Sequence, residues 1–229
     1  AGEAALRTGA GLVRVLTRKE HRTFLLTRTP ELMVFEAESE NQFESIIYES
    51  DVVLIGPGLG SDSWAEQLLD AGLKSSAAIV LDADALNLLT NKKITSLRSK
   101  CIISTPHPGE AARLLSCSSA EVQKDRFKAA EAIQEILGGI VVLKGNGTLI
   151  SDGQNFLLCG YGNPGMATAG MGDVLGGVVA SLLAQGLEAK LASSLAVSLH
   201  AAAADKIRSE GMRGMIASDL MVPMREFLG

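Results

Sequence analysis

The sequence lacks several features that mark other classes of protein. Aromatic residues make up only 4% of its 229 residues, and its formal net charge is −5. An acidic chain of this kind offers no electrostatic surface for nucleic acid or for an anionic membrane. The three cysteines are odd in number and fit no zinc-ligand spacing. We therefore expect reduced thiols in a reducing compartment.

Long apolar runs are absent too. The most apolar stretch, residues 174–184, lies between Asp173 and Gln185. It is shorter than the roughly 20 residues that a helix needs to cross a bilayer. The start of the chain shows no secretory signal. We therefore expect a cytoplasmic enzyme with no membrane partner and no nucleic-acid partner.

What is present is typical of one globular domain. Hydrophobic residues make up 47% of the chain and charged residues 21%, which is ordinary for a soluble domain. No linker, repeat or low-complexity segment divides it, so we predict a single domain over residues 1–229. The chain starts with Ala1 instead of Met, and its first residues already have a helical pattern. We expect an N-terminal segment to be missing.

Strand-like and helix-like segments alternate along the chain. Short β-branched and aliphatic runs predict strands at 12–16, 52–55, 78–81, 101–104 and 140–143. Helical patterns occur near 62–73, 84–90, 119–137, 170–185, 188–208 and 217–227, and Ser118 with Glu121 predicts a capping box. Residues 148–151 and 155–158, joined through Asp152-Gly153, predict a hairpin. This alternation favours an α/β fold with a mainly parallel sheet and helices on both faces.

Ligands in such folds bind beyond the carboxyl ends of the strands, and the first loop there is rich in glycine. Gly56-Pro57-Gly58-Leu59-Gly60 follows the strand at 52–55. Glycines let the backbone approach a ligand closely, although a plain tight turn explains the loop equally well. It is not the G-x-G-x-x-G dinucleotide motif, because Ser61 occupies the last glycine position.

The next two strand-end loops carry polar side chains. Asp82 and Asp84 follow the strand at 78–81. We expect Asp84 to cap the next helix and Asp82 to act at the site, on a hydrated metal ion or a polar substrate. After the next strand, two prolines fix the backbone around His107, which we expect to contact a ligand. Glu110 is either a first-turn acid favoured by the helix dipole or a residue that orders metal-bound water.

The segment from Gly162 to Asp173 is the strongest chemical signal. Gly170 and Gly172 open a helix whose first amides have no partner within the helix. Those amides and the helix dipole suit phosphate oxygens, and Asp173 beside them can take the proton of a hydroxyl that attacks the phosphate. A glycine-lined turn is the structural alternative. A simple turn does not need this many small residues.

Lys144-Gly145-Asn146-Gly147-Thr148 follows the strand at 140–143. It places a lysine, two glycines and a hydroxyl where a nucleotide phosphate can lie, although it lacks the residue order of a P-loop. His200, on a helix rich in Ala and Leu, is expected to be a packing residue.

Together and in this order, these motifs resemble the ADP-dependent NAD(P)H-hydrate dehydratase family of the ribokinase-like superfamily. The resemblance covers residues 1 to about 220 and implies a three-layer α/β/α sandwich with a mainly parallel sheet. It implies a lyase that repairs nicotinamide nucleotides. ADP phosphorylates the ring hydroxyl of (S)-NADHX or (S)-NADPHX, and loss of phosphate restores NADH or NADPH with AMP as the other product.

The resemblance also implies roles for the site residues. Asp173 is the base, and the anion hole is formed by Gly170, Met171 and Gly172. The nucleotide is held by Lys144, Gly145, Asn146, Gly147, Thr148 and Gly172. The hydrate contacts Gly58, His107, Asp82, Asn163 and Asp173. Glu110 matches the acidic residue that organises Mg²⁺ through water.

Further expectations come from the same resemblance. Family members carry a glycine-rich segment ahead of the position of Ala1, assemble as homotetramers, and in many bacteria are fused to an NAD(P)H-hydrate epimerase. The motif set favours ADP over ATP as the phosphoryl donor.

Two other functions remain open from the residues alone. A small-molecule kinase of the same superfamily, such as a hydroxyethylthiazole kinase, uses the same base and anion hole but stops at a phosphorylated alcohol. A non-catalytic nucleotide-binding regulator is disfavoured, because it has no use for a carboxylate aimed into an anion hole.

Overall fold

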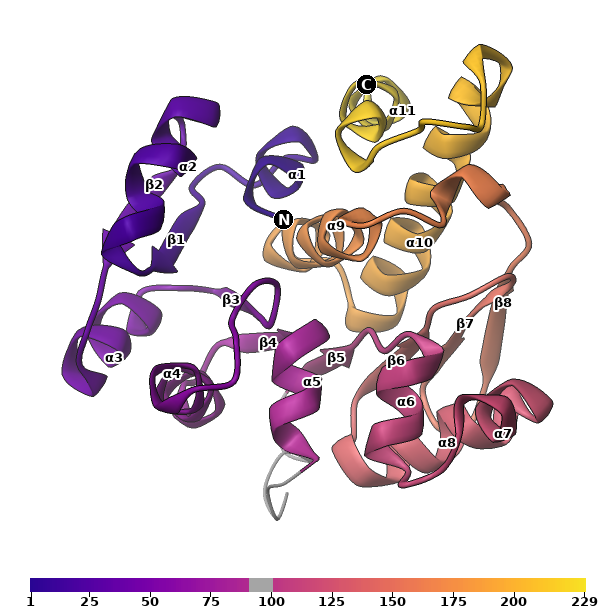
Figure 1. Ribbon diagram of the computed structural model, residues 1–229, viewed down its shortest axis with the longest axis horizontal. Coiled ribbons are helices and arrows are strands. Elements are labelled where there is room, and N and C mark those ends of the chain that lie inside the picture. Colours follow the sequence, from indigo (N-terminus) through magenta and orange to yellow (C-terminus); the bar gives the residue numbers. More distant parts are fainter. Residues whose placement is uncertain (91–100) are drawn as a thin grey trace.

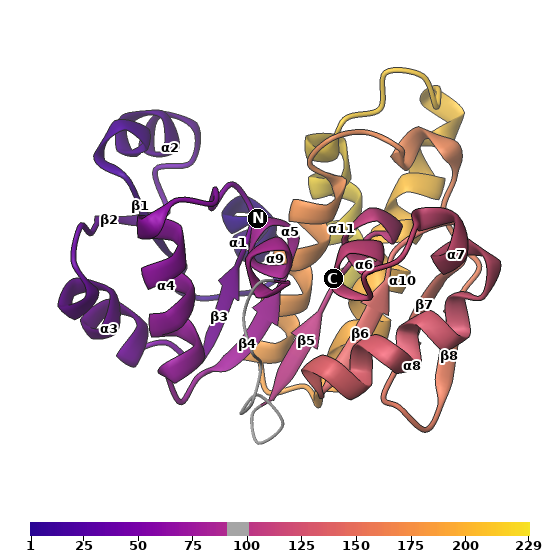
Figure 2. The same cartoon turned by 60° about the horizontal axis from the view of Figure 1, so that its bottom comes forward.

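The computed structural model describes residues 1–90 and 101–229, without the side chains of Glu40 and Glu210. A six-stranded sheet forms its centre, with helices on both faces (Figures 1 and 2). In spatial order the strands are β3 (Val52–Ile55), β4 (Ala78–Leu81), β5 (Ile102–Ser104), β6 (Ile140–Leu143), β7 (Thr148–Ser151) and β8 (Phe156–Cys159). Strands β3 to β6 pair in parallel, and β7 and β8 are antiparallel. The predicted mainly parallel sheet and the hairpin are confirmed.

All of the described helices except α2, which packs on the smaller sheet described below, divide between the two faces of this sheet. In chain order the helices are α1 (Gly2–Arg7), α2 (Arg22–Arg28), α3 (Glu40–Tyr48), α4 (Ser63–Lys74), α5 (Ala83–Leu89), α6 (Pro108–Leu114), α7 (Ser119–Lys124), α8 (Arg126–Leu137), α9 (Met171–Ala184), α10 (Ala189–Ile207) and α11 (Met221–Leu228). Helices α3 to α8 pack on one face, and α1, α9, α10 and α11 pack on the other.

Alternation along the strands builds both halves of the core. In β4, Ile79 and Leu81 join the apolar cluster on the α4 side, whereas Val80 joins the cluster on the α9 side. All three side chains are fully buried. Successive residues of a strand point to opposite faces, so a strand covered on both faces needs the uninterrupted apolar run seen in the sequence.

A second, smaller sheet lies beside the first. It pairs β1 (Arg14–Thr17) in parallel with β2 (Met33–Glu36). The sequence pattern predicts the first of these strands two residues early and misses the second. Strand β2 overlaps the apolar run at residues 32–35, so a signal for it was present in the sequence, although its outer two residues are exposed.

The prediction of one helix over residues 119–137 is wrong in one respect, because this segment forms two helices, α7 and α8. Asp125 has φ −145° and separates α7 from α8, and its carboxylate accepts a hydrogen bond from the Lys128 amide at 3.0 Å. The capping box at the start of α7 is confirmed. Ser118 Oγ accepts from the Glu121 amide at 3.2 Å, and the Glu121 carboxylate accepts from the Ser118 amide at 2.8 Å.

The structure also bears on membrane spans and on the cysteines. None of the described helices is both long and apolar enough to traverse a bilayer. The three cysteines, Cys101, Cys117 and Cys159, are unpaired.

The ends of β3 and β4 meet so closely that one position admits only glycine. Gly56 has φ +132°, and a Cβ atom added there would lie 1.7 Å from the carbonyl oxygen of Asp82. The Asp82 amide in turn donates to the Ile55 carbonyl oxygen at 3.0 Å. The backbone approach at Gly56 therefore sets the position of the loop that carries Asp82.

We predict that Gly56→Ala destabilises the protein much more than Gly186→Ala. Both glycines have positive φ, which costs another residue about 1–2 kcal/mol, but Gly186 has open space around it. The clash at Gly56 should add about 1–3 kcal/mol. Denaturant unfolding of both variants measures the difference. Equal losses of unfolding free energy would contradict the close approach.

Candidate active site

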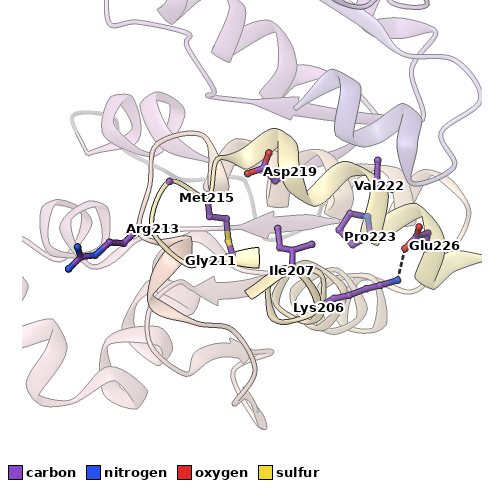
Figure 3. Close-up of a pocket in the computed structure, with 10 residues that line it drawn as sticks. Lys206, Ile207, Gly211, Arg213, Met215, Asp219, Val222, Pro223 and Glu226 are labelled. Carbon is purple, nitrogen blue, oxygen red and sulfur yellow. Dashed lines mark hydrogen bonds and ion pairs between the residues drawn. The ribbon is translucent and has the colours of Figure 1, made fainter. Parts of the chain in front are cut away.

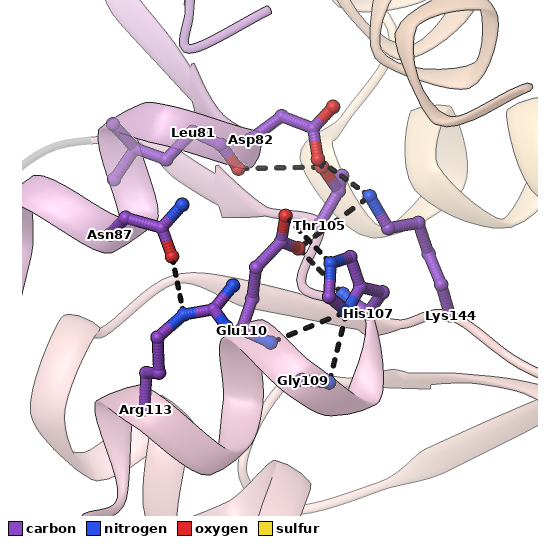
Figure 4. A network of polar contacts seen from close by, with 9 residues as sticks. All are labelled: Leu81, Asp82, Asn87, Thr105, His107, Gly109, Glu110, Arg113 and Lys144. Carbon is purple, nitrogen blue, oxygen red and sulfur yellow. Dashed lines mark hydrogen bonds and ion pairs between the residues drawn. The ribbon is translucent and has the colours of Figure 1, made fainter. Parts of the chain in front are cut away.

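Hydrogen bonds join the loops that follow the carboxyl ends of the parallel strands (Figure 4). The Gly60 amide donates to Asp84 Oδ2 at 2.9 Å, which ties the glycine-rich loop to α5. Thr105 Oγ1 donates to Asp82 Oδ1 at 2.8 Å, and the Lys144 amide donates to the Pro106 carbonyl oxygen at 2.9 Å. Loops that the sequence selects as candidate ligand-binding loops are thus linked to one another in the structure.

The expectation that Asp84 caps the next helix is wrong. Helix α5 begins one residue earlier, so Asp82 occupies the N-cap position and makes no side-chain capping bond. Asp84 lies in the first turn, and its carboxylate accepts the Gly60 amide instead. From the sequence, a carboxylate that follows a strand can cap the next helix or bind a neighbouring loop. The contact of Asp84 with Gly60 depends on the fold, so the sequence does not reveal it.

Lys144 lies between two buried carboxylates. Its Nζ is 2.6 Å from Asp82 Oδ1 and 3.8 Å from Glu110 Oε2. The Asp82 side chain is 1% exposed and the Lys144 side chain 17%. Burying these charges is costly unless they are paired and hydrogen-bonded, and here the Thr105 hydroxyl completes the pairing. Asp82 holds Lys144 in place, and its predicted contact with substrate stays a prediction.

His107 caps α6 and is tied to Glu110. Its Nδ1 accepts the amides of Gly109 at 2.9 Å and Glu110 at 3.3 Å, so Nδ1 carries no proton. The proton of the neutral ring therefore lies on Nε2, which is 3.2 Å from Glu110 Oε1. The His107 amide donates to Glu110 Oε2 at 2.8 Å. Half of the His107 side chain stays exposed, which leaves a ring face for a ligand.

The start of α9 has the form that the sequence predicts for an anion hole. Gly170 has φ +86°, a left-handed conformation, and precedes the helix. The first amide to bond back to it is that of Val174, which donates to the Gly170 carbonyl oxygen at 3.0 Å. A Cβ atom added at Gly172 would lie 3.1 Å from Lys144 Nζ. The helix opening and the Lys144 ammonium therefore face the same space.

Asp173 lies in the first turn of α9 and is partly buried. Burial raises the pKa of its carboxyl group and the nearby Asp82 charge raises it further, whereas the amino group of Ala1 and, more weakly, the Lys144 ammonium oppose them. A raised pKa makes the ionised carboxylate a better proton acceptor. The residue that the sequence selects as the base is thus tuned in the required direction.

Gly58 and Asn163 lie in the two remaining loops that the sequence assigns to the hydrate. Gly58 has φ +64°, and no atom lies within 4 Å of the place where its Cβ would be, so this loop is open to a ligand. Asn163 Oδ1 accepts the Gly165 amide at 3.0 Å, and its Nδ2 donates to Asp205 Oδ1 at 3.0 Å. Asp205 also accepts the Gly162 amide at 2.8 Å. Sequence reasoning missed Asp205, an isolated acid on α10 with no motif around it.

His200 is buried as expected, but it is also tied to the anion hole. Burial lowers the pKa of its imidazole to about 4, partly opposed by a hydrogen bond to the Met171 backbone. The ring is therefore neutral at physiological pH. Its contact with the start of α9 was not visible in the sequence, because nothing local relates His200 to Met171.

A cavity of about 650 Å³ lies elsewhere, between the end of α10 and α11 (Figure 3). Among its charged groups, Lys206 Nζ contacts the Glu226 carboxylate, and Asp219 accepts the Ile216 amide at 2.9 Å. We assign the chemistry to the strand-end loops instead.

Comparison with known proteins identifies the family. The family model described as NAD(P)H-hydrate dehydratase matches residues 1–224. The chain belongs to the NAD(P)H-hydrate dehydratase family. The ribokinase-like fold predicted from the sequence is confirmed as well.

Three similar proteins illustrate the family. A bifunctional NAD(P)H-hydrate repair enzyme of Coxiella burnetii is 47% identical, with 98% of this chain and 46% of that protein covered. An ADP-dependent (S)-NAD(P)H-hydrate dehydratase of Neisseria meningitidis is 40% identical, with 96% and 76% covered. The ADP/ATP-dependent NAD(P)H-hydrate dehydratase of Bacillus subtilis, co-crystallized with ATP/Mg²⁺ and soaked with CoA, is 29% identical with a TM-score of 0.88, covering 98% and 83%. The chain spans about half the length of the bifunctional relatives.

The side chains of this family member do not form a dedicated metal cage. In the part of the chain that the structure describes, no group of three or more His, Cys, Asp and Glu residues can hold a metal ion. Mg²⁺ is commonly held by one or two carboxylates, water and substrate phosphates. Glu110 is buried beside the anion hole's Lys144, so the donor set fits a Mg²⁺ ion that arrives with a nucleotide.

We predict that Asp173→Asn makes the protein more stable at neutral pH. Because the folded-state pKa of Asp173 is raised, ionisation costs folding free energy above that pKa. Asparagine removes this cost. The gain in melting temperature over the parent should shrink as pH falls through the raised pKa and vanish below the ordinary value of 3.8.

Asp152→Asn provides a control of opposite sign. The hydrogen bond from Lys190 holds the pKa of Asp152 below its usual range, so this variant should lose stability at neutral pH. Its deficit should also shrink below pH 3.8. A loss of stability in Asp173→Asn at neutral pH would show that Asp173 is not a desolvated carboxylate.

Proposed function

We propose that the chain catalyses ADP-dependent dehydration of (S)-NADHX and (S)-NADPHX to NADH and NADPH, with AMP and phosphate as the other products. The observation that carries this is the start of α9. Free helix amides, the Lys144 ammonium and a partly buried Asp173 face one space there. Membership of the family and the name of the Neisseria meningitidis relative support the reaction and the ADP donor.

The residues divide the first step between them. Asp173 takes the proton of the hydrate's ring hydroxyl as its oxygen attacks the β-phosphorus of ADP. The bond between the two phosphate groups breaks, and AMP leaves. The amides of Gly170, Met171 and Gly172 bind the transferring group, whose charge is spread over its oxygens, so positioned donors and charges supply most of the catalysis.

The second step restores the double bond. The ring C–O bond of the phosphorylated hydrate breaks with loss of phosphate, and a proton leaves the adjacent ring carbon to solvent. The amides and Lys144 that bind the transferring group in the first step also donate hydrogen bonds to the departing phosphate in the second step, because its oxygens stay in the same place. Phosphate is a far better leaving group than hydroxide, which is why dehydration needs a phosphoryl donor.

The remaining predicted contacts complete the proposal. Residues Lys144, Gly145, Asn146, Gly147 and Thr148, with Gly172, hold the nucleotide, and residues Gly58, His107, Asp82 and Asn163 line the hydrate site. Mg²⁺, when bound, neutralises phosphate charge, with Glu110 acting through water. Gly58 supports this arrangement, because its surroundings are open and its loop is anchored by Asp84.

We further propose that the single domain 1–229 assembles as a cytoplasmic homotetramer. An epimerase, fused or separate, would convert the R-form hydrate to the S-form that this site uses. The bifunctional relatives, whose length exceeds this chain about twofold, support the fused arrangement.

The reaction is tested with purified (S)-NADHX, ADP and Mg²⁺. We expect reduced-nicotinamide absorbance to recover with one AMP formed per NADH, and Asp173→Asn to lower the rate by about 10²–10⁴-fold because the base is lost. ADP affinity should be largely kept. Asp152→Asn, on the hairpin, is the control with parent-like turnover. A stable phosphorylated hydrate would indicate a kinase, and unchanged turnover in Asp173→Asn would refute the assigned base.

We predict that Lys144→Met weakens ADP binding. A charge-assisted hydrogen bond to phosphate contributes about 1.5–3 kcal/mol, so the Kd from calorimetry should rise by about 10–100-fold. Removing Lys144 also leaves Asp82 buried without its cation, which destabilises the fold by about 3–5 kcal/mol.

The double variant Lys144→Met/Asp82→Asn separates these two effects. It removes the unpaired charge, so it should regain melting temperature but not ADP affinity. Recovery of affinity in the double variant would show that Lys144 acts only through the fold.

A further inference from the structure

Arg126, the first residue of α8, contacts the backbone of the loop that follows β6. Its Nη1 donates to the carbonyl oxygens of Asn146 at 2.7 Å and Gly147 at 2.8 Å. Its Nη2 donates to those of Leu143 at 2.9 Å and Lys144 at 3.4 Å. A single guanidinium group therefore gathers four carbonyl oxygens of one short segment.

This arrangement decides where the loop amides point. In a trans peptide unit the carbonyl oxygen and the N–H of the next residue point in opposite directions. With the carbonyls of Lys144 and Asn146 directed at Arg126, the amides of Gly145 and Gly147 point away from it. Within the described residues, these two amides donate no hydrogen bond to another group of the protein. Amides presented in this way form a concave site for an anion.

The backbone of the loop is adapted to the guanidinium. Gly145 has φ +151°, and an added Cβ atom would lie 3.0 Å from Arg126 Nη2. Gly147 has φ +73°. A side chain at Gly145 would push the guanidinium from the carbonyls, so this glycine and Arg126 are matched.

The charge of Arg126 is not neutralised by an acidic side chain. No described carboxylate forms an ion pair with it, and its Nε is buried without a partner. Asp125, its neighbour, is occupied in capping α8 through the Lys128 amide. Among the described residues, the groups that contact this positive charge are the four carbonyl oxygens of the loop.

We propose that Arg126 is the positioning residue of the nucleotide-binding loop: it fixes the carbonyls of residues 143–147 so that the loop amides face the phosphates of a nucleoside diphosphate. This inference rests on the proposed assignment of the Lys144 loop to the nucleotide. Arg126 acts through the loop and does not touch the nucleotide.

The test compares Arg126→Met, Arg126→Lys and the control Lys128→Met, which removes an exposed positive charge from the same helix. Calorimetry with ADP and steady-state kinetics are measured for each. Arg126→Met should raise both the Kd and the KM for ADP by about 10-fold or more, with the KM for the hydrate within about twofold of the parent. Lys128→Met should match the parent in all three constants.

Arg126→Lys separates geometry from charge. An ammonium group keeps the charge but cannot span four carbonyl oxygens, so most of the ADP affinity should stay lost. Full rescue by lysine would overturn the positioning role in favour of charge alone. A lower melting temperature and kcat, with both KM values unchanged, would reduce Arg126 to a structural residue and overturn the proposal too.

The outcomes keep this inference distinct from the function on which it rests. If Lys144→Met loses ADP affinity and Arg126→Met keeps it, the role of Arg126 fails and the nucleotide assignment stands. If neither variant loses affinity, the assignment of the loop itself fails. Should Arg126→Met not fold, hydrogen exchange of the parent decides: ADP must protect the amides of Gly145 and Gly147, and unprotected amides would overturn the proposal.

Discussion

The ammonium group of Lys144 connects the sheet to the start of α9, and the geometry of the candidate site depends on how this group is held. It follows β6, pairs with Asp82 at the end of β4, and lies near Glu110 at the start of α6. The two carboxylates are almost completely buried and the Lys144 side chain is mostly buried, so removing the lysine leaves buried negative charge without its cation. Three strand-end loops are thereby fixed in one arrangement.

The same ammonium group couples the fold to the chemistry. It lies against Gly172, where any side chain would crowd it, and it opposes the effects of burial and of Asp82 on the pKa of Asp173. The proposed base, the proposed anion hole and the cation are therefore one electrostatic unit. The proposed role of Arg126 extends this unit. Its guanidinium binds the carbonyl side of the Lys144 loop, and the amides of Gly145 and Gly147 point to the opposite side.

Much of the sheet could be predicted from the sequence, because burial on both faces leaves a simple pattern. Strands β3, β4, β6 and β7 coincide with the predicted runs. Strand β2 overlaps an apolar run at residues 32–35 that the sequence analysis passed over, because its outer residues are exposed and it belongs to a separate small sheet. The break at Asp125 depends on a single capping carboxylate within a long helical stretch, and local periodicity carries no information about it.

The site could be predicted in its parts but not in its connections. Motif residues such as Gly170, Gly172 and Lys144 stand out because their types are unusual where strands end. The contacts of Asp84 with Gly60, Asp205 with Asn163 and Arg126 with the Lys144 loop join residues about 20 or more positions apart. Each depends on the crossover topology, so a local reading assigned Asp84 to a cap and passed over Asp205 and Arg126.

A crystal structure with ADP, Mg²⁺ and NADH tests the central claim most directly. The account predicts that the β-phosphate lies within hydrogen-bond distance of the amides at 170–172 and of Lys144 Nζ, with the Asp173 carboxylate directed at the nicotinamide ring. A β-phosphate bound elsewhere, or an Asp173 carboxylate turned away from the ring, would contradict it.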